Sequence, residues 1–390
     1  MERSDFFSDM KIAIDATTIC DASGGEGAGI ECYTWSLVFS LIREFPSHRF
    51  LIFVPAAFPS DREDILVGPR GYVRIFRQPS RGIPFLFRHL LFPLAAYLWR
   101  AKVLLLPATH GPIFWKGKSV SVIHDVAIYE HPEWFPTSSV EHLTTRWIVP
   151  RVLSRAAHLI VVSEATKQAV SRVFPFLRAP ISVVRQGVSD EFPQHPISHV
   201  EEFVLFLGTI EPRKNIETVC RVFSRFLEIH PEKARGLKLM IAGSEGWKME
   251  KIHEAIACVN QRWREAAGED VVRVVGPVSE REKWFLYHNA QTFLFPSLEE
   301  GFGRPALEAM AAGAPVVCSN AGALPEVVGD AALVADPLDV EALTLLLSQC
   351  LLMPEVAEKL RAAGKERAKQ FSWDAVARQV GKILESVVEK

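Results

Sequence analysis

Short apolar runs recur along the whole chain, and their pattern indicates buried strands separated by helices. In the second half the runs are FVLFLG (203–208), LKLMIAG (237–243), VVRVVG (271–276), TFLFP (292–296), APVVCS (314–319) and AALVAD (331–336). Each run is apolar throughout, without alternating polar positions, which is typical of strands covered on both faces in a parallel sheet. Comparable runs occupy residues 11–15, 50–54, 72–76, 103–106, 119–123 and 159–162 in the first half.

Amphipathic segments between these runs indicate helices. In residues 216–229 the apolar side chains fall at intervals of three and four, as on one helix face: Ile216, Val219, Cys220, Phe223, Phe226 and Leu227. Alternation of strand and helix predicts right-handed parallel α/β units. The series occurs twice, with the polar segment 189–202 between. We therefore predict two facing Rossmann-like domains, residues 1–188 and 200–370, followed by an amphipathic helix at 373–390 that Ser372 caps.

Composition and charge narrow the function. The chain has 390 residues and a formal net charge of −2, which argues against a protein that neutralises a nucleic-acid backbone. Residues 1–190 carry 21 Lys and Arg against 17 Asp and Glu, and residues 191–390 carry 23 against 29. The six cysteines have no metal-ligand spacing, and MERSDFFSDM is unlike a signal peptide. We expect a cytoplasmic protein without a metal.

The strongest chemical pattern is PSLEEGFGRPALEAMAAGAPVV at residues 296–317. A predicted strand ends at Pro296, the glycines of a loop follow, Pro305 suits the start of a helix and Gly313 suits the position after its end. A helix N-terminus preceded by glycines favours an anion such as a phosphate. Glu300 and Glu308 bracket the loop and could clamp hydroxyl groups of a ligand. Taken alone, the same pair could be a helix cap and a solvated surface acid.

The segment Glu300-Gly301-Phe302-Gly303-Arg304-Pro305-Ala306-Leu307-Glu308 resembles the E-x7-E motif of retaining glycosyltransferase family 4, which has the GT-B fold. The resemblance extends through VIHD (122–125), VSEAT (162–166), RQGVSDEF (185–192), GTIEPRKN (208–215) and AGSEGW (242–247). It implies that the final helix crosses back to the first domain. Packing of that helix on its own domain is the alternative.

The resemblance also implies a donor site in the second domain. Arg213 and Lys214 would grip the pyrophosphate of a nucleoside-diphosphate sugar, Glu300 would hold sugar hydroxyls and Glu308 the ribose. The remaining donor contacts implied are Gly208, Gly243, Gly276, Gly301, Phe302, Gly303, Arg304 and Leu307. Two adjacent cations at a strand end can neutralise a departing diphosphate, although such a pair is often only a solvated surface.

In the first domain the resemblance places His124 beside the donor sugar and Asp125 at the acceptor. A single histidine is otherwise often structural. The glycine loop GGEGAGIECYT (24–34) could cradle a phosphate, with Gly29 as the diphosphate contact. The family commonly has Gly-x-Gly-x-Tyr here, whereas this chain has Glu31 in place of the second glycine and Cys32 in place of the usual following Arg. The resemblance implies an acceptor contact at Glu31, at a position where this chain departs from the family pattern.

These residues predict a retaining transferase that moves a hexose from a nucleotide sugar by front-face substitution without a metal cofactor. GDP-mannose is the favoured donor, and a glycan or lipid-linked saccharide of cell-surface polysaccharide synthesis is the expected acceptor. Two alternatives are a non-catalytic nucleotide-sugar-binding scaffold and an NAD-dependent oxidoreductase. The second is disfavoured because the first glycine loop lacks G-x-G-x-x-G.

Residues 81–107 suggest contact with a membrane. The segment begins at Arg81, and Arg88, His89, Arg100 and Lys102 interrupt it, so it is too short between charges for a spanning helix. They alternate with Phe85, Phe87, Phe92 and Trp99, a pattern of segments that lie on anionic lipid. A core helix with a basic edge fits as well. The expected location is the cytoplasm, with a peripheral contact at the cytoplasmic face of the inner membrane if this segment lies on lipid.

Overall fold

The computed structural model describes residues 10–19, 29–67, 72–79, 84–136, 144–188 and 201–390. It divides into two compact units, one made of Met1–Val126, Thr137–Gly187 and Ser372–Lys390, the other of Ala127–Pro136 and Val188–Phe371. The predicted domains placed residues 127–136 in the first domain, whereas this segment groups with the second unit. The predicted boundary at 189–200 lies outside the described residues.

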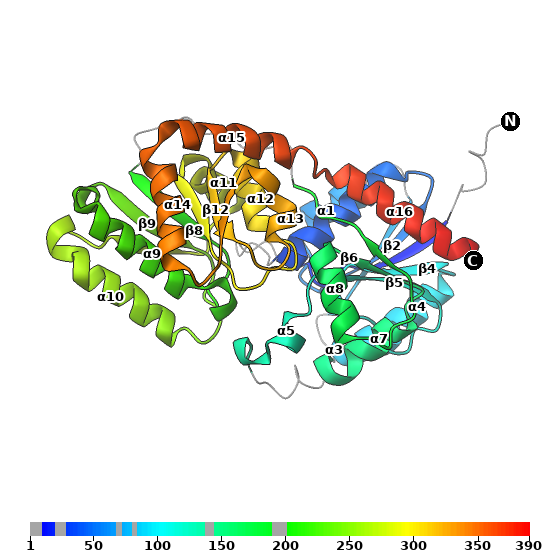
Figure 1. Ribbon diagram of the computed structural model, residues 1–390. Helices are drawn as coiled ribbons and strands as arrows, with labels where there is room; N and C mark the ends of the chain where they lie inside the picture. Colours follow the sequence, from blue (N-terminus) through cyan, green and yellow to red (C-terminus); the bar gives the residue numbers. More distant parts are fainter. Residues whose placement is uncertain (1–9, 20–28, 68–71, 80–83, 137–143, 189–200) are drawn as a thin grey trace. The chain divides into compact units, whose positions relative to one another are not determined.

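The first unit is a parallel sheet of seven strands with helices packed on it (Figure 1). The strands lie in the order β3-β2-β1-β4-β5-β6-β7. Their bounds are β1 (Lys11–Asp15), β2 (Arg49–Val54), β3 (Val73–Arg77), β4 (Val103–Leu106), β5 (Lys118–Ile123), β6 (His158–Val161) and β7 (Ile181–Val183). The helices are α1 (Gly29–Glu44), α2 (Ser60–Val67), α3 (Pro84–Leu86), α4 (Phe92–Leu98), α7 (Val149–Arg155), α8 (Glu164–Val173) and α16 (Trp373–Glu389).

The second unit is a parallel sheet of six strands in the order β10-β9-β8-β11-β12-β13. The strands are β8 (Glu202–Leu207), β9 (Leu237–Ala242), β10 (Val272–Gly276), β11 (Thr292–Phe295), β12 (Val316–Ser319) and β13 (Leu333–Ala335). Its helices are α5 (Ala127–Glu130), α9 (Ile216–Ile229), α10 (Glu250–Ala267), α11 (Glu280–Asn289), α12 (Arg304–Ala312), α13 (Leu324–Val328), α14 (Val340–Leu352) and α15 (Pro354–Ala368).

Both sheets are the doubly wound type that the apolar runs predicted. Strand order reverses between β1 and β4 in the first unit and between β8 and β11 in the second. In such sheets a ligand binds outside the carboxyl ends of the strands at this reversal. The strand interiors are buried, because helices cover both faces of each sheet. The fold therefore directs attention to the residues that follow β1, β4, β8 and β11.

The C-terminal helix α16 packs on α1 of the first unit, as the GT-B resemblance implied (Figure 1). The Ser372 side chain accepts a hydrogen bond from the Asp374 backbone N–H, so the predicted cap is confirmed. The inward stripe of α16 is Val376, Val380, Leu384 and Val387, all buried. Arg43 of α1 pairs with Asp374, which fixes the two helices at this end.

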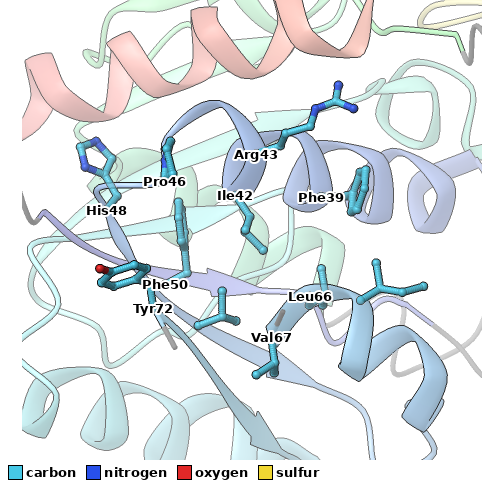
Figure 2. Close-up of a pocket in the computed structure, with 11 residues that line it drawn as sticks. Phe39, Ile42, Arg43, Pro46, His48, Phe50, Leu66, Val67 and Tyr72 are labelled. Atoms are coloured by element: carbon cyan, nitrogen blue, oxygen red, sulfur yellow. The ribbon is translucent and has the colours of Figure 1, made fainter. Parts of the chain in front are cut away.

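A small apolar pocket of about 240 Å³ lies beside α1, α2 and the strands β2 and β3. Ile42, Phe50, Leu66 and Val67 surround it (Figure 2). Two of its lining residues also contact α16, since Arg43 pairs with Asp374 and His48 Nε2 lies 3.3 Å from Glu385 Oε1.

Candidate active site

Three predicted glycines lie at neighbouring strand ends of the second sheet. The Gly208 N–H donates to the Ala242 carbonyl at 3.0 Å, and the Gly243 N–H donates to the Gly276 carbonyl at 2.8 Å. A Cβ atom on Gly243 would lie 2.0 Å from the Gly208 oxygen, so the two backbones approach too closely for any side chain. The contact requires glycine where β8 and β9 approach each other, and Gly276 likewise leaves the end of β10 without a side chain.

Arg213 and Lys214 belong to a single 3-10 turn, Pro212–Lys214, in the loop after β8. The turn ends at Asn215, which has φ of 57°. The Asn215 side-chain amide donates to the carbonyls of Pro296 and Pro337 at 2.9 and 2.8 Å. Asn215 therefore ties this turn to the loop that follows β11. Its role was not found by sequence reasoning, although the left-handed conformation suits asparagine.

The two cations meet Glu300 in a buried cluster. Lys214 Nζ donates to Glu300 Oε1 at 2.5 Å, and Arg213 Nη1 lies 3.5 Å from Glu300 Oε2. Arg213 also donates to Glu211 Oε1 at 2.7 Å and to the Glu299 carbonyl at 3.0 Å. Burial by itself raises the pKa of a carboxyl, but Lys214 and Arg213 outweigh it and hold the pKa of Glu300 below its ordinary value. Glu300 is consequently ionised at neutral pH.

The Glu300 backbone is fixed by a glycine that the sequence patterns did not indicate. Gly322, at φ 54°, lies so close that a Cβ atom on it would be 2.3 Å from the Glu300 oxygen. The next residue, Ala323, donates its N–H to the same oxygen at 2.8 Å. Gly322 lies in the loop after β12 and has no periodic or motif context, so only the fold shows that it supports the Glu300 loop.

Glu308 lies inside α12, as its spacing predicted. The helix begins after Gly303, which has φ of 91°, and ends at Gly313, which has φ of 85°. Arg304 Nε and Lys283 Nζ approach Glu308 Oε1 at 3.1 and 3.3 Å. Glu308 is buried, so the interpretation as a solvated surface acid is wrong.

The charge of Glu308 is set by its partners. Burial raises the pKa of this carboxyl, but the charges of Lys283 and Arg304 lower it by more than burial raises it. The pKa of Glu308 therefore lies below its ordinary value. The Tyr287 hydroxyl donates to Glu308 Oε2 at 3.4 Å. Lys283 and Tyr287 stand one turn apart on α11, and sequence reasoning missed both, because neither belongs to the motif that contains Glu308.

Two other predicted donor contacts, Phe302 and Leu307, have buried side chains. The Phe302 ring packs edge-on against Phe371 at 5.9 Å between centroids. A ligand could reach such residues only through their backbone groups. Their packing holds the start of α12 in place, and Gly301 and Arg304 lie in the same turn of chain.

In the first unit His124 follows β5 directly and is buried. His124 Nε2 is 2.8 Å from the Pro107 carbonyl, which only accepts, so the proton is on Nε2. Tyr33 meets the imidazole edge-on at 4.5 Å between ring centroids. The His124 carbonyl accepts from Thr166 Oγ1 at 3.4 Å. These contacts fix the position of His124 at the end of the sheet.

The other predicted first-unit residues are divided between surface and interior. Asp125 is exposed, and Gly29 is the first residue of α1. Glu31 is buried in the first turn of α1, with Arg62 Nη1 at 3.8 Å from Oε1. Residues 24–28 of the glycine loop lie outside the described residues.

The end of β1 carries a polar cluster that sequence reasoning did not find. Asp15 Oδ1 accepts from Thr17 Oγ1 at 2.5 Å, and Arg88 Nη2 donates to the same hydroxyl at 2.6 Å. Arg88 Nε lies 4.0 Å from Asp15 Oδ2. Burial lowers the pKa of the neighbouring His89, and the charge of Arg88 lowers it further. The cluster lies where the strand order reverses, which is the ligand position in this fold.

Two further features bear on ligands and membranes. Within the ranges that the structure describes, no three His, Cys, Asp or Glu side chains gather as a metal ion would require. In the same ranges no single helix is long and apolar enough to cross a membrane, and α14 with α15 meets the length and composition requirement only as a pair bent by 96°.

Comparisons with known proteins agree with this architecture. Residues 188–367 match the family model described as glycosyl transferases group 1. O-antigen chain mannosyltransferase B of Escherichia coli is 32% identical over 281 residues, 68% of this chain and 70% of that protein. MMP alpha-(1->4)-mannosyltransferase of Mycolicibacterium hassiacum is 30% identical over 258 residues, which cover 64% of this chain and 60% of that protein.

Solved structures show the same fold. Sucrose-phosphate synthase from Thermosynechococcus elongatus superposes with a TM-score of 0.71 at 21% identity, covering 97% of this chain and 99% of that one. Anabaena HepE, solved in complex with UDP and glucose, has a TM-score of 0.68 at 18% identity and covers 97% of this chain and 100% of that one.

The two parallel doubly wound sheets and the returning C-terminal helix define the GT-B class. Within that class the chain belongs to the glycosyl transferases group 1 family, and it is a glycosyltransferase.

Proposed function

We propose that this enzyme transfers mannose, with retention, from GDP-mannose to a glycan or lipid-linked saccharide in cell-surface polysaccharide synthesis. Support for mannose comes from relatives: O-antigen chain mannosyltransferase B and MMP alpha-(1->4)-mannosyltransferase match about two thirds of this chain. A third relative is O-antigen chain mannosyltransferase RfbU of Salmonella typhimurium, at 23% identity over 72% of this chain and 73% of that protein. The sugar and the acceptor class rest on these similarities.

The observation that carries the donor proposal is the buried cluster of Arg213, Lys214 and Glu300. Two cations next to the glycine-lined ends of β8 and β9 would neutralise the diphosphate of a nucleotide sugar. Glu300 already holds Lys214 at 2.5 Å, so the cation is positioned before a donor arrives. Preorganised charge of this kind stabilises a leaving group without reorganisation during the reaction.

The proposed reaction is a front-face substitution. The bond between the anomeric carbon and the diphosphate oxygen breaks, and the acceptor oxygen forms the new bond on the same face. The departing diphosphate accepts the acceptor's hydroxyl proton, so no protein base is needed. Arg213 and Lys214 stabilise the negative charge that develops on the diphosphate, as a metal ion would elsewhere. His124 is proposed to contact the donor sugar as positive charge develops at the anomeric carbon.

Glu308 is proposed to bind the ribose hydroxyls of the nucleotide. An ionised carboxylate accepts hydrogen bonds at about four lone-pair positions, and three protein groups approach it here. Because Lys283 and Arg304 keep the pKa of Glu308 low, it remains an acceptor for hydroxyl protons. Gly29, Glu31 and Asp125 keep their proposed roles at the diphosphate and the acceptor.

Donor choice is tested by thermal shift and by mass detection of slow sugar release. GDP should raise the melting temperature more than UDP or dTDP, because a ligand that binds only the folded state stabilises it by mass action. Mannose should be released from GDP-mannose faster than glucose from UDP-glucose or rhamnose from dTDP-rhamnose. Stabilisation by UDP alone would reject the guanine donor, while leaving the transferase activity untouched.

The roles of the residues are tested by substitution. Lys214→Ala should lower donor turnover at least about 100-fold, the loss seen when a preorganised charge contact to a reacting group is removed. Glu308→Ala removes a charged hydrogen-bond partner of the ribose and should lower donor turnover about 10-fold to 100-fold. Matched controls are Lys369→Ala and Glu341→Ala, whose side chains lie on the surface in pairs with Glu366 and Arg225. If either site variant folds and turns over donor like its control, the role assigned to that residue is wrong.

A further inference from the structure

The helical segment from α3 to α4 presents an uncovered apolar face. Its exposed apolar side chains are Phe85 and Leu86 in α3, followed by Leu90, Leu91, Leu94, Tyr97 and Leu98, and the last five are here called the apolar stripe. Leu94 is 55% exposed, Tyr97 70% and Leu98 75%. Their spacing of three, four and seven places them on one helix side, and residues 90–98 contain no charged side chain. An exposed apolar surface of this kind marks a site of interaction.

The opposite side of the same helix already supplies the packing that the fold needs. Phe87, Phe92 and Ala96 are buried in a core cluster with Leu51 and Phe53. Phe87 and Phe92 therefore do not face lipid. The prediction that these two aromatic rings lie on a membrane together with the basic residues was wrong. Arg88 likewise turns to Thr17 and Asp15. Arg81 lies outside the described residues.

A basic pocket of about 440 Å³ adjoins the C-terminal end of this stripe. It is lined by Lys11, Arg49, Tyr72, Arg74, Leu98, Trp99 and Arg100. The four cations come from the amino ends of β1, β2 and β3 and from the turn after α4, while no carboxylate lines the pocket among the described residues. Lys11 Nζ donates to the Trp99 carbonyl at 3.2 Å, which joins the strand end to the helix end. Leu98 belongs to both the pocket and the stripe.

We propose that the apolar stripe and the basic pocket together form a docking surface for an anionic phospholipid bilayer. The stripe would enter the boundary between headgroups and acyl chains, and the cations would bind lipid phosphates, as in interfacial amphipathic helices. The basic pocket lies at the amino ends of β1, β2 and β3. The stripe runs along the helix from there to Leu90, close to Arg88 of the polar cluster at the end of β1. Such docking would determine where the enzyme works, whichever sugar it transfers.

Charge decides between a bilayer and a second copy of this chain. In a two-fold symmetric dimer the same patch faces itself, so Lys11, Arg74 and Arg100 would be brought toward their own copies. Like charges brought together in this way repel one another. An anionic lipid surface complements the same cations, so we take the bilayer as the occupant.

The experiment is co-sedimentation of the full chain with vesicles of phosphatidylcholine alone or of equimolar phosphatidylcholine and phosphatidylglycerol. We expect binding to the anionic vesicles only, weakened by salt. The double variant Arg74→Gln/Arg100→Gln should weaken binding more than about tenfold, because each basic residue near such a surface contributes about fivefold. Leu94→Gln/Leu98→Gln should weaken it about tenfold or more by removing the apolar insertion.

Matched controls are Arg178→Gln, an exposed cation of the first unit, and Leu345→Gln, a 60% exposed leucine of α14. The second control also tests the bent pair of α14 and α15 as an alternative membrane contact. The proposal is overturned if the stripe and pocket variants bind like wild type, or if only Leu345→Gln loses binding. A sedimentation-velocity dimer that Leu94→Gln/Leu98→Gln dissociates would assign the surface to self-association instead.

Discussion

At the scale of single residues, Glu308 makes stability depend on pH. Its pKa is lower in the folded state than the ordinary value of 4.5, because Lys283 and Arg304 outweigh burial. A carboxyl with a depressed folded pKa contributes stability that is complete above the unfolded pKa and is lost as pH falls through the folded pKa. We expect Glu308→Gln to reduce the free energy of unfolding at pH 7, and this deficit to shrink below pH 4.5, as measured by urea denaturation at several pH values.

The control for this measurement is Glu341→Gln, which removes an exposed carboxylate paired with Arg225. An exposed pair contributes about 0–1 kcal/mol, so this variant should follow the wild-type pH profile closely. A constant deficit for Glu308→Gln from neutral to acidic pH would mean that its charge is not what stabilises the fold.

The ion pair of Lys214 and Glu300 allows catalysis and stability to be separated. Lys214→Met removes one of the two cations that face Glu300 and should cost about 1–3 kcal/mol in the free energy of unfolding, since the ionised Glu300 keeps only Arg213 Nη1, at 3.5 Å. The double variant Lys214→Met/Glu300→Leu should recover much of this loss while remaining inactive. Urea denaturation and donor turnover are measured on the same variants. A double variant no more stable than Lys214→Met would contradict the explanation that the charge left on Glu300 causes the loss.

Residue roles could be predicted from sequence only where a motif fixes them. Glu300 and Glu308 are recognisable because seven residues of a glycine-rich segment separate them. Lys283, which determines the charge of Glu308, is 25 residues away in an ordinary helical segment. Arg88 and Thr17 are 71 residues apart, so only the folded sheet brings them together. Their roles depend on tertiary packing, which no local spacing encodes.

At the scale of elements, the glycines at the strand ends predict a graded response to alanine. Gly243→Ala places a Cβ atom 2.0 Å from a backbone oxygen and should cost more than about 3 kcal/mol, the most of the series. At Gly276 a Cβ atom would have open space, but φ is 83°. Gly276→Ala should therefore lower the free energy of unfolding by about 1–2 kcal/mol through the left-handed backbone conformation alone. Gly236→Ala, with open space and φ of −114°, should be neutral or stabilise by about 0.4–1 kcal/mol.

Thermal unfolding of the three alanine variants checks this order. Equal losses at Gly243 and Gly276 would show that the β8 and β9 backbones can separate, and that the close contact is not required. The order of the three stability losses could not be predicted from sequence. Each glycine stands at one end of an apolar run, and nothing in the run shows how much space surrounds it.

The strands themselves were largely predictable because continuous apolar runs identify them. The runs at 11–15 and 103–106 coincide with β1 and β4, and most others shift by one or two residues. The strand β7, Ile181–Val183, was missed because it has only three residues and Ser182 interrupts its apolar run. Short edge strands bury little apolar surface, so they leave a weak pattern.

At the scale of the whole molecule, sequence order and spatial order differ in two places. The segment Ala127–Pro136 leaves the first unit, and within the second unit Trp247 Nε1 donates to the Trp134 carbonyl at 2.6 Å. Phe135 packs against the same tryptophan at 5.9 Å between centroids. These contacts explain why a single boundary, drawn where the first strand–helix series ends, assigned residues 127–136 differently.

The second place is α16, which completes the first unit from the far end of the chain. Leu384 is fully buried on α16, so Leu384→Ala should lower the stability of this unit by about 2–5 kcal/mol. Each unit has its own core, so the loss should remain local.

Hydrogen exchange followed by mass spectrometry should show faster exchange in α1 and α16, with α9 and α14 unchanged. Leu347→Ala, an equally buried leucine of α14, should give the reverse pattern. Faster exchange in α9 after Leu384→Ala would instead mean that α16 stabilises both units together, and that the first unit is not its sole packing partner.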